Sequence, residues 1–242
     1  MPKVDLVIPV LNEEHSLPGC LEKLTDFLSK NLELEWRIVV ADNGSTDRTF
    51  EVAKAYVENH PGQIGLISLS EKGRGRALKK AWIESEANVV SYMDVDLSTG
   101  LEAFPVLINM ILDRKNDIAW GSRLSSKSNT RRSINREIIS RLYNYLIRIL
   151  MRTRFKDAQC GFKALSQDAA KALLPHIKDN DWFFDTELLI VAEKNGLKGQ
   201  EIPVQWTEDP DSRVKIVRTA IQDLKGLLRL RLGGIPNVSI RD

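Results

Sequence analysis

The chain has 242 residues, of which 43% are hydrophobic and 28% charged, and its formal net charge is +2. This composition is ordinary for a soluble globular protein, and the near-neutral charge gives no general sign of a polyanion-binding protein. No apolar run reaches the roughly 18 residues of a transmembrane helix, and no signal-peptide pattern is visible. Two cysteines are too few for a disulfide framework, so a reducing compartment fits.

Strand-like and helix-like segments alternate through the first half of the chain. Short apolar runs rich in β-branched residues predict strands at residues 4–10, 36–41, 64–69, 89–93 and 117–121. The segments between them carry apolar residues at helical spacing, beginning with Leu17, Leu21, Leu24 and Leu28. This alternation predicts an α/β fold, with a mainly parallel sheet and helices on both of its faces.

Polar side chains follow three of these strands at the point where each strand ends. Right-handed crossovers place the ends of the first, second and fourth strands along one edge of the sheet, where such folds bind ligands. Asp94 and Asp96 follow the fourth strand one residue apart, and two such anions repel each other unless a cation or hydrogen-bond donors compensate their charge. Carboxylate oxygens suit Mg²⁺ or Mn²⁺. The alternative is a pair of surface aspartates that cap the next helix.

Two basic segments mark the second half. Between residues 127 and 156 there are nine Lys and Arg residues and one acid, Glu137. Apolar residues recur at helical spacing in that segment and again near the C-terminus, at Ile138, Leu142, Tyr145 and Ile149, and at Val217, Ile221, Leu224 and Leu228. Basic amphipathic helices indicate an anionic membrane surface or a phosphorylated partner. Equally, each stripe could pack on the core. Nucleic-acid binding fits the charge, but no stacking platform or binding motif accompanies it.

Four motifs in the first half resemble those of the family 2 glycosyltransferases of the GT-A fold: VIPVLNEE at 7–14, VVADNGSTD at 39–47, GRGRA at 73–77 and DVDLST at 94–99. Four later motifs resemble the dolichyl-phosphate sugar synthases: GSR at 121–123, DAQCGFK at 157–163, WFFDTELL at 182–189 and EIPVQW at 201–206. The dolichyl-phosphate β-glucosyltransferases resemble the chain most, and the dolichyl-phosphate mannose synthases come next. Any one motif is weak, whereas the ordered set is specific.

The resemblance implies an inverting transfer of glucose from UDP-glucose to dolichyl or another polyprenyl phosphate, with Mg²⁺ or Mn²⁺. GDP-mannose and UDP-GlcNAc are the alternative donors. It also implies a GT-A catalytic domain at residues 1–212, with a nucleotide-sugar-binding half (1–123) and an acceptor-binding half (124–212), followed by an amphipathic helix and tail (213–242). We expect a peripheral protein on the cytoplasmic face of a membrane, which reaches the bilayer by its amphipathic helices, by a membrane partner or by residues outside this sequence. A homo-oligomer is a further partner to expect.

The resemblance assigns the nucleotide sugar to seven positions: Pro9, Leu11, Glu13, Asp42, Asp94, Asp96 and Arg213. Asp94 and Asp96 match the metal motif, with Asp96 the more direct ligand. Two departures from the family pattern stand out. Asn43 replaces the second of two consecutive acids, and Ser98 replaces an amide that assists the metal in mannose synthases. Outside this resemblance, Asp42 and Asn43 would serve only to form a turn.

For the acceptor phosphate the resemblance indicates Arg123, Arg136 and Ser140, and the catalytic residues are expected to be Asp96, Arg123 and Asp185. A phosphate monoester has a second pKa of about 6, so it is already a nucleophile near neutral pH and needs no general base. Asp185 and Glu187 fall where relatives with hydroxyl acceptors carry that base. We expect one of them to hold sugar hydroxyls or orient the acceptor, with helix capping as the alternative. A non-catalytic membrane scaffold is the main hypothesis outside the enzymes.

Overall fold

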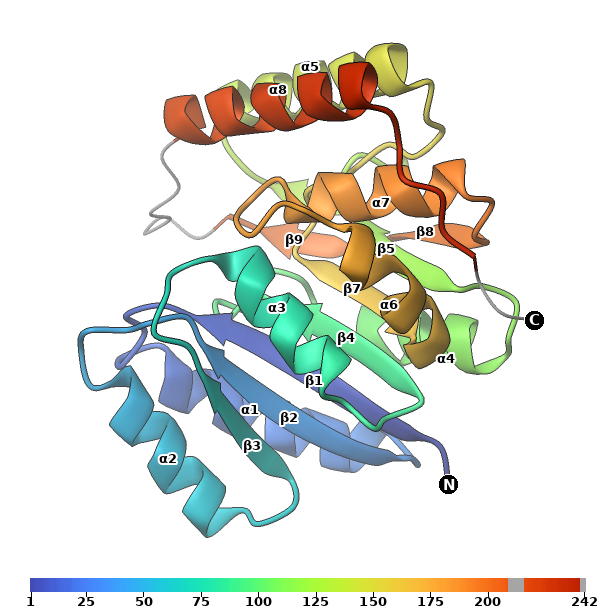
Figure 1. The fold of residues 1–242 in the computed structure, drawn as a ribbon. Helices are drawn as coiled ribbons and strands as arrows, with labels where there is room; N and C mark the ends of the chain where they lie inside the picture. Colours follow the sequence, from blue (N-terminus) through green and yellow to red (C-terminus); the bar gives the residue numbers. More distant parts are fainter. Residues whose placement is uncertain (209–215, 240–242) are drawn as a thin grey trace.

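A seven-stranded sheet forms the centre of the computed structural model, which describes residues 1–208 and 219–239 in full and the backbone of residues 216–218. The strands lie in the order β3-β2-β1-β4-β7-β5-β8 (Figure 1). Their bounds are β1 Lys3–Val10, β2 Glu35–Asp42, β3 Ile64–Ser68, β4 Val89–Met93, β5 Ile118–Ser122, β7 Phe162–Ser166 and β8 Gly199–Pro203. Only β7 runs antiparallel to its neighbours, so the mainly parallel α/β sheet predicted from the sequence is confirmed.

The five predicted strands all form, and no end differs by more than one residue from the expected one. The fourth, β4, is buried along its whole length, as its apolar sequence predicted. The sequence did not predict β7, which comes from the second half of the chain and lies between β4 and β5. A five-residue run has too little periodicity to show its state, and its place in the sheet depends on pairing with distant strands.

Helices cover both faces of the sheet and bury two separate apolar cores (Figure 1). One face carries α1 Leu17–Asn31, α2 Thr49–Asn59 and α4 Ala103–Leu112. The other face carries α3 Arg74–Ile83, α6 Gln167–Leu173 with the short 3₁₀ helix η1 Leu174–His176, and α7 Phe184–Lys194. Burial on both faces explains why the strands read as continuous apolar runs in the sequence.

Two long helices, α5 Ile134–Met151 and α8 Ile216–Gly233, lie side by side above α7 and away from the sheet (Figure 1). Their inward residues, Ile147, Met151, Leu227 and Leu230, belong to the core. The apolar stripes recognised in the sequence face outward, with exposed side chains at Ile138, Leu142, Tyr145, Ile149, Ile221, Leu224 and Leu228. The alternative hypothesis that these stripes pack on the core is therefore wrong for the residues named. The side chain of Val217 lies outside the described residues.

A small parallel sheet, β6 Asn129–Arg131 with β9 Gln205–Thr207, connects the start of α5 to the main sheet. Trp206 also pairs with Thr99, three residues after Asp96. Within the described ranges, no helix has both the length and the apolar composition that crossing a bilayer requires. The N-terminal end of α5 is thus held close to the loop that follows β4.

Asp223 is a buried carboxylate on the inward face of α8, and burial raises its pKa to about 7. Its Oδ2 accepts a hydrogen bond from Gln159, while Oδ1 has no partner within the described residues. Because the folded-state pKa lies above the ordinary value, this group lowers stability as the pH rises from about 4 to 7. We expect Asp223→Asn to stabilise the protein by about 1–3 kcal/mol at pH 8 and to have little effect near pH 4.

Urea unfolding curves of the wild type and Asp223→Asn at both pH values measure this effect. The exposed Asp113→Asn provides a control in which the charge change is the same but the carboxylate is hydrated. A wild-type protein that matches Asp223→Asn in stability at pH 8 would show that the carboxylate is ionised at no cost.

Candidate active site

The carboxyl ends of β1, β2 and β4 meet at one edge of the sheet. Val10 of β1 pairs with Asp42, and Val7 pairs with Tyr92, which lies two residues before Asp94. Asp42 and Asp94 therefore lie at nearly the same level, on the two strands that flank β1. Neighbouring strands are about 4.8 Å apart, so these two strand axes are separated by about 10 Å. The strand order thus brings both carboxylates to the edge at which the sequence predicted a ligand site.

The loops after β1 and β2 are tied together by hydrogen bonds. Asn12 adopts a left-handed backbone conformation, with φ of 58°, and its amide oxygen accepts the Thr46 N–H at 2.8 Å. Next to it, the Glu13 N–H donates to the Thr49 hydroxyl at 2.7 Å. These bonds fix the position of Glu13 beside the second loop. The other predicted nucleotide residues of this strand, Pro9 and Leu11, are half-buried.

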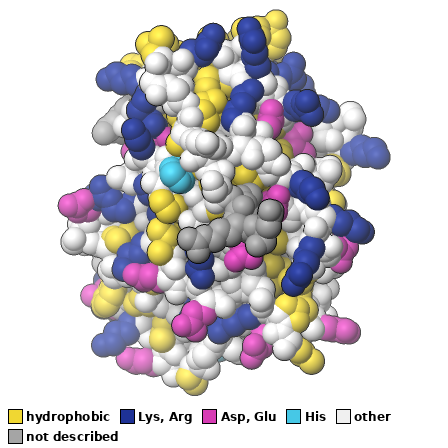
Figure 2. All heavy atoms as spheres, turned by 45° about the vertical axis from the view of Figure 1, so that its right-hand side comes forward, with side chains coloured by type: hydrophobic (Ala, Val, Ile, Leu, Met, Phe, Trp, Pro, Cys, Tyr) yellow, Lys and Arg dark blue, Asp and Glu magenta, His cyan; other side chains and the backbone are white. Residues whose placement is uncertain are grey.

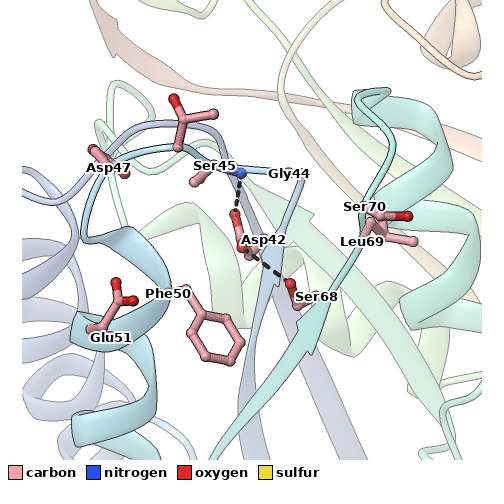
Figure 3. A pocket seen from close by; sticks show the side chains of 10 residues that line it. Asp42, Gly44, Ser45, Asp47, Phe50, Glu51, Ser68, Leu69 and Ser70 are labelled. Atoms are coloured by element: carbon pink, nitrogen blue, oxygen red, sulfur yellow. Dashed lines mark hydrogen bonds between the residues drawn. The ribbon is translucent and has the colours of Figure 1, made fainter.

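Asp42 lines a pocket of about 520 Å³ formed by the end of β2, the end of β3 and the start of α2 (Figure 3). Its carboxylate accepts the Ser45 N–H at 3.0 Å and the Ser68 hydroxyl at 3.2 Å. Phe50 contributes an aromatic ring to the same pocket (Figure 3). Asp42 therefore shapes the turn, as the simpler interpretation predicted, and also borders a cavity. Of the predicted nucleotide residues that the structure describes, only Asp42 lines it.

Asp94 is paired with a buried arginine. The guanidinium of Arg74, at the start of α3, donates from Nη2 to Asp94 and from Nη1 to Asp185, each at 2.6 Å. It also lies over the rings of Tyr92 and Trp182, at 4.9 and 5.1 Å from their centroids. Burial alone would lower the pKa of Arg74, but the two carboxylates raise it well above its ordinary value. Arg74 is therefore a permanent cation beside the metal motif.

Asp185 lies at the centre of this buried network. Its Oδ1 pairs with Lys163 of β7 at 2.8 Å and accepts the Tyr92 hydroxyl, while Oδ2 accepts from Arg74. The Lys163 side chain is fully buried and also donates to two backbone carbonyls, those of Ala158 and Cys160. Burial raises the pKa of Asp185, but Lys163 and Arg74 outweigh it and hold that pKa below its ordinary range. Asp185 is thus ionised and shared by two cations.

The partners of Glu187 give this residue a structural role. Its carboxylate is fully buried and pairs with Arg229 of α8 at 2.9 Å through both oxygens. It also accepts the backbone N–H of Asp179 at 2.8 Å. Of the two acids that match the position of a catalytic base in relatives, Asp185 is the one connected to Asp94, and Glu187 links α7 to α8.

The metal motif itself lies on the surface side of this network. Asp96 is exposed, and one of its oxygens accepts the Ser98 N–H at 2.9 Å. Burial raises the pKa of the Cys20 thiol to about 12, and the charges of Asp96 and Glu13 add to this shift. Gly161 packs so closely on Asp94 that a Cβ atom there would overlap the carboxylate. The first carboxylate is thus fixed in place, and the second faces solvent.

The carboxylates of Asp94 and Asp96 suit a hard divalent cation for which the protein supplies only some of the ligands. No group of three or more His, Cys, Asp or Glu side chains in the described part of the chain is arranged to enclose a metal. Mg²⁺ typically keeps several waters and binds through one or two carboxylates together with phosphate oxygens. Two aspartates at a sheet edge match that mode, in which a bound diphosphate completes the coordination.

Arg123 follows β5 directly and is held by a buried carboxylate. Its Nε and Nη2 donate to Asp157, each at 2.8 Å, and its backbone N–H donates to the same group. The guanidinium also lies 5.5 Å from the centre of the Trp206 ring. Burial alone would lower the pKa of Arg123, but Asp157 and, more weakly, Asp94 raise it. The charge of Asp94 therefore acts on Arg123.

The other predicted acceptor residues lie on the first turns of α5. Arg136 pairs with Glu208 at 2.9 Å, and this ion pair connects α5 to the end of β9. The hydroxyl of Ser140 and Nη2 of Arg132 are buried, and neither has a hydrogen-bond partner within the described residues. Buried donors without acceptors are costly, so this end of α5 is suited to a bound anion. The seventh predicted nucleotide residue, Arg213, lies outside the described residues.

Several residues of the site were present in the sequence motifs without an assigned role. Arg74, Gly161 and Lys163 belong to the motifs at 73–77 and 157–163, and Asp157 begins the second of these. A lysine within a buried strand signals a buried partner, because an unpaired ammonium is too costly there. The sequence cannot identify that partner, since Lys163 and Asp185 are brought together only by the packing of α7 on the sheet. Cys160 is buried and free, and burial raises its pKa to about 12, as expected for a packing residue.

Comparison with known proteins gives a consistent result. A family model described as glycosyl transferase family 2 matches residues 5–174. The chain is 32% identical to glycosyltransferase AglD of Haloferax volcanii over 89% of its length, which is only 35% of that protein. It is 33% identical to dolichyl-phosphate beta-glucosyltransferase ALG5D of Trichomonas vaginalis, over 95% of this chain and 74% of that protein.

Among solved structures, the glucosyl-3-phosphoglycerate synthase of Mycobacterium tuberculosis has the same fold. Its complex with Mn²⁺, UDP-glucose and phosphoglyceric acid superposes with a TM-score of 0.71 at 18% identity, over 98% of this chain and 81% of that one. At this identity the likeness concerns the architecture alone.

Proposed function

The chain belongs to glycosyltransferase family 2, and from that membership we propose that it transfers glucose from UDP-glucose to dolichyl or another polyprenyl phosphate, with inversion and with a divalent metal. The acceptor and the sugar are supported by the names of relatives that match 94–95% of this chain, all dolichyl-phosphate beta-glucosyltransferases. UDP and the metal are supported by the fold neighbour, which holds both UDP-glucose and Mn²⁺. GDP-mannose and UDP-GlcNAc are the competing donors.

One observation carries the proposal more than any other. Trp206, whose ring centre lies 5.5 Å from the guanidinium of Arg123, pairs with Thr99 of the motif that contains Asp94 and Asp96, so the proposed acceptor residue and the proposed metal ligands are held at one place. The charge of Asp94 also contributes, weakly, to the raised pKa of Arg123. A group that prefers cations and a group that prefers anions therefore lie within electrostatic range of each other at one sheet edge. Transfer of a sugar between two phosphates requires this arrangement, because donor diphosphate and acceptor phosphate must approach the same carbon atom.

On the donor side, we assign the nucleotide to Pro9, Leu11, Glu13 and Asp42, of which Asp42 lines the pocket at the end of β2. The Asp42 carboxylate can accept the imide N–H of uracil in addition to its two present donors, because each carboxylate oxygen has two lone pairs. Asp94 and Asp96 would hold Mg²⁺ or Mn²⁺, which neutralises charge on the leaving diphosphate as a Lewis acid. Arg213, although outside the described residues, remains our proposed second cation for that diphosphate.

On the acceptor side, an oxygen of the lipid phosphate attacks the anomeric carbon while the bond from that carbon to the UDP oxygen breaks. The phosphate is already ionised, so Arg123, Arg136 and Ser140 need only bind and orient it. Both oxygens of Asp185 already accept hydrogen bonds from Arg74, Lys163 or Tyr92. We therefore propose that Asp185 acts through Arg74, by fixing the guanidinium beside Asp94, and contributes no base.

The location follows from the substrates. A lipid acceptor requires a bilayer, and we propose a peripheral protein at the cytoplasmic face, where free thiols such as Cys20 and Cys160 stay reduced. A membrane partner would add to this attachment, and a homo-oligomer is the other protein partner that we propose.

The direct test is transfer of labelled glucose from UDP-glucose to polyprenyl phosphate in the presence of Mg²⁺ or Mn²⁺. We expect a lipid-linked product that EDTA abolishes, and less product with labelled GDP-mannose or UDP-GlcNAc. If no polyprenyl phosphate yields a product with any of the three donors, the acceptor assignment is wrong. Metal-dependent hydrolysis of the donor would then dismiss a non-catalytic membrane scaffold.

Arg136→Ala should weaken acceptor use selectively. Loss of one charged hydrogen bond to phosphate corresponds to about a tenfold rise in KM for the acceptor, whereas KM for UDP-glucose should stay within about twofold. A short, water-soluble polyprenyl phosphate keeps membrane effects out of this measurement. Arg141→Ala, on the same helix and paired with Glu137, is the matched control. Equal changes in both KM values would contradict a role for Arg136 at the acceptor.

A further inference from the structure

The outward faces of α5 and α8 form one apolar surface, which we call the outer helix face. It consists of Ile138, Leu142, Tyr145 and Ile149 of α5, and Ile221, Leu224 and Leu228 of α8. Leu142 is 62% exposed and Ile221 is 52% exposed. The two helices lie side by side (Figure 1), and burial together with the charge of Asp223 on α8 raises the pKa of Tyr143 on α5. Large apolar side chains gathered in this way on the surface of a folded domain indicate a binding surface.

The apolar side chains cannot be buried by turning either helix, because the inward faces are already fixed. Gly226 of α8 packs so closely on the Phe183 ring that a Cβ atom there would overlap it. Arg229 pairs with Glu187 of α7, one turn from Gly226. On α5, Ile147 and Met151 belong to the core. Packing of the inward faces therefore fixes the orientation of both helices and keeps the outer helix face exposed.

The charges around this face are almost all positive. Exposed basic side chains border it, at Arg148, Arg152, Lys225 and Arg231. The acids of the two helices do not oppose them, because Glu137 is paired with Arg132 and Arg141, and Asp223 faces inward. Figure 2 shows Lys and Arg side chains with hydrophobic side chains among them in the upper part of the molecule, where the two helices lie. This charge complements an anionic surface.

We infer that the outer helix face binds the surface of an anionic bilayer, with its apolar side chains at the boundary between headgroups and acyl chains. An interfacial helix has this combination of apolar residues facing the lipid and bases that reach the headgroups. A second copy of the chain fits less well, because a symmetric contact would bring the same bases together.

The position of α5 gives this surface a role in the reaction, and this part of the inference rests on the proposed function. The first turn of α5 is connected to the loop after Asp96, since Arg136 pairs with Glu208 and the Thr207 N–H donates to the Ser98 carbonyl. A bilayer against α5 would therefore lie beside the proposed phosphate-binding residues. The headgroup of a lipid phosphate could then reach them while its chain stays in the membrane.

The test is co-sedimentation with large unilamellar vesicles of phosphatidylcholine, with and without about one quarter phosphatidylglycerol. We expect the wild type to bind the neutral vesicles weakly and the anionic vesicles more tightly. The affinity for the anionic vesicles should exceed that for the neutral ones by about fivefold for each base that contacts the surface. The double variant Leu142→Asp/Leu228→Asp should lose at least about tenfold in affinity, because both apolar contacts are replaced by anions. Both positions are exposed, so the fold should be retained, and thermal unfolding checks this.

Val106→Asp is the matched control, since Val106 is 50% exposed but lies on α4, which packs on the opposite face of the sheet. Vesicle binding that is equal in the wild type and the double variant, or absent in both, would overturn the inference. A wild type that is dimeric in solution while the double variant is monomeric would also overturn it, and would identify the face as a contact between copies.

A further measurement separates this inference from the proposed function. The double variant should still glucosylate a short, water-soluble polyprenyl phosphate at the wild-type rate, while losing activity on long-chain acceptor in vesicles. If the wild type binds anionic vesicles but transfers no glucose to any polyprenyl phosphate, the proposed function fails and the bilayer-binding surface stands.

Discussion

Asp96→Ala should reduce the rate of glucosyl transfer by about a thousandfold, the magnitude lost when one group that stabilises transition-state charge is removed. Asp96 is exposed, and the Ser98 N–H, two residues along, donates to its carboxylate. Thermal unfolding of the variant checks that the fold is retained, so that the loss of rate reports the chemistry. Steady-state rates with saturating UDP-glucose and Mn²⁺ measure this effect.

A second readout makes this prediction independent of turnover. Mn²⁺ raises the thermal unfolding temperature when it binds the folded protein together with UDP, since a ligand of the native state stabilises it. The rise should be present in the wild type and absent in Asp96→Ala. Glu102→Ala, a change at an exposed carboxylate six residues further along, should behave as the wild type in both assays. Full activity of Asp96→Ala would show that the metal assignment is mistaken.

Asp185→Ala should destabilise the protein by about 3–5 kcal/mol, because it removes the carboxylate shared by two buried cations. Lys163 would keep only neutral partners, and Arg74 would keep only Asp94. The free energy of unfolding, measured with urea at pH 7, gives the size of the effect. Asp168→Ala, at an exposed position on α6, is the control and should cost less than about 1 kcal/mol.

Acid should reveal the same interaction. The folded-state pKa of Asp185 lies below its ordinary value, so its contribution to stability is complete above about pH 5 and is lost as the pH falls through the folded-state pKa. The stability difference between the wild type and Asp185→Asn should therefore be constant at neutral pH and shrink in acid. A difference that grows as the pH falls would mean that Asp185 is protonated in the native protein.

Activity offers a separate view of the network. If Asp185 acts by fixing Arg74, then Arg74→Lys should retain the fold and change the affinity for UDP and Mn²⁺, because the lysine cannot bridge Asp94 and Asp185 with the same fork. This consequence follows from geometry that no local motif contains, since Arg74 and Asp185 are 111 residues apart in the chain.

Much of the site could be predicted from the sequence because it depends on local pattern. A short apolar run between helix-like segments, such as residues 89–93, is typical of a buried strand, and Asp94 and Asp96 then fall at its carboxyl end. The alternation of strands and helices fixes the handedness of the crossovers, which brings Asp42 to the same edge. Arg123 likewise follows β5, as expected.

Other features required the folded chain, because they depend on contacts between distant segments. The antiparallel insertion of β7 carries Lys163 to Asp185 and Gly161 to Asp94, and no periodicity in five residues signals a strand direction. Asp157, which holds Arg123, is recognisable only once both are placed.

The amphipathic helices show most clearly what the sequence determines and what is left to the tertiary structure. Their sequence determined that α5 and α8 each carry an apolar stripe bordered by bases, since spacing along a helix fixes which residues share a face. It did not determine which face meets the protein, because each helix also carries a second set of apolar residues, such as Ile147 on α5 and Leu227 on α8. Tertiary packing chose that second set, through close contacts such as Gly226 on Phe183, and left the larger stripe exposed.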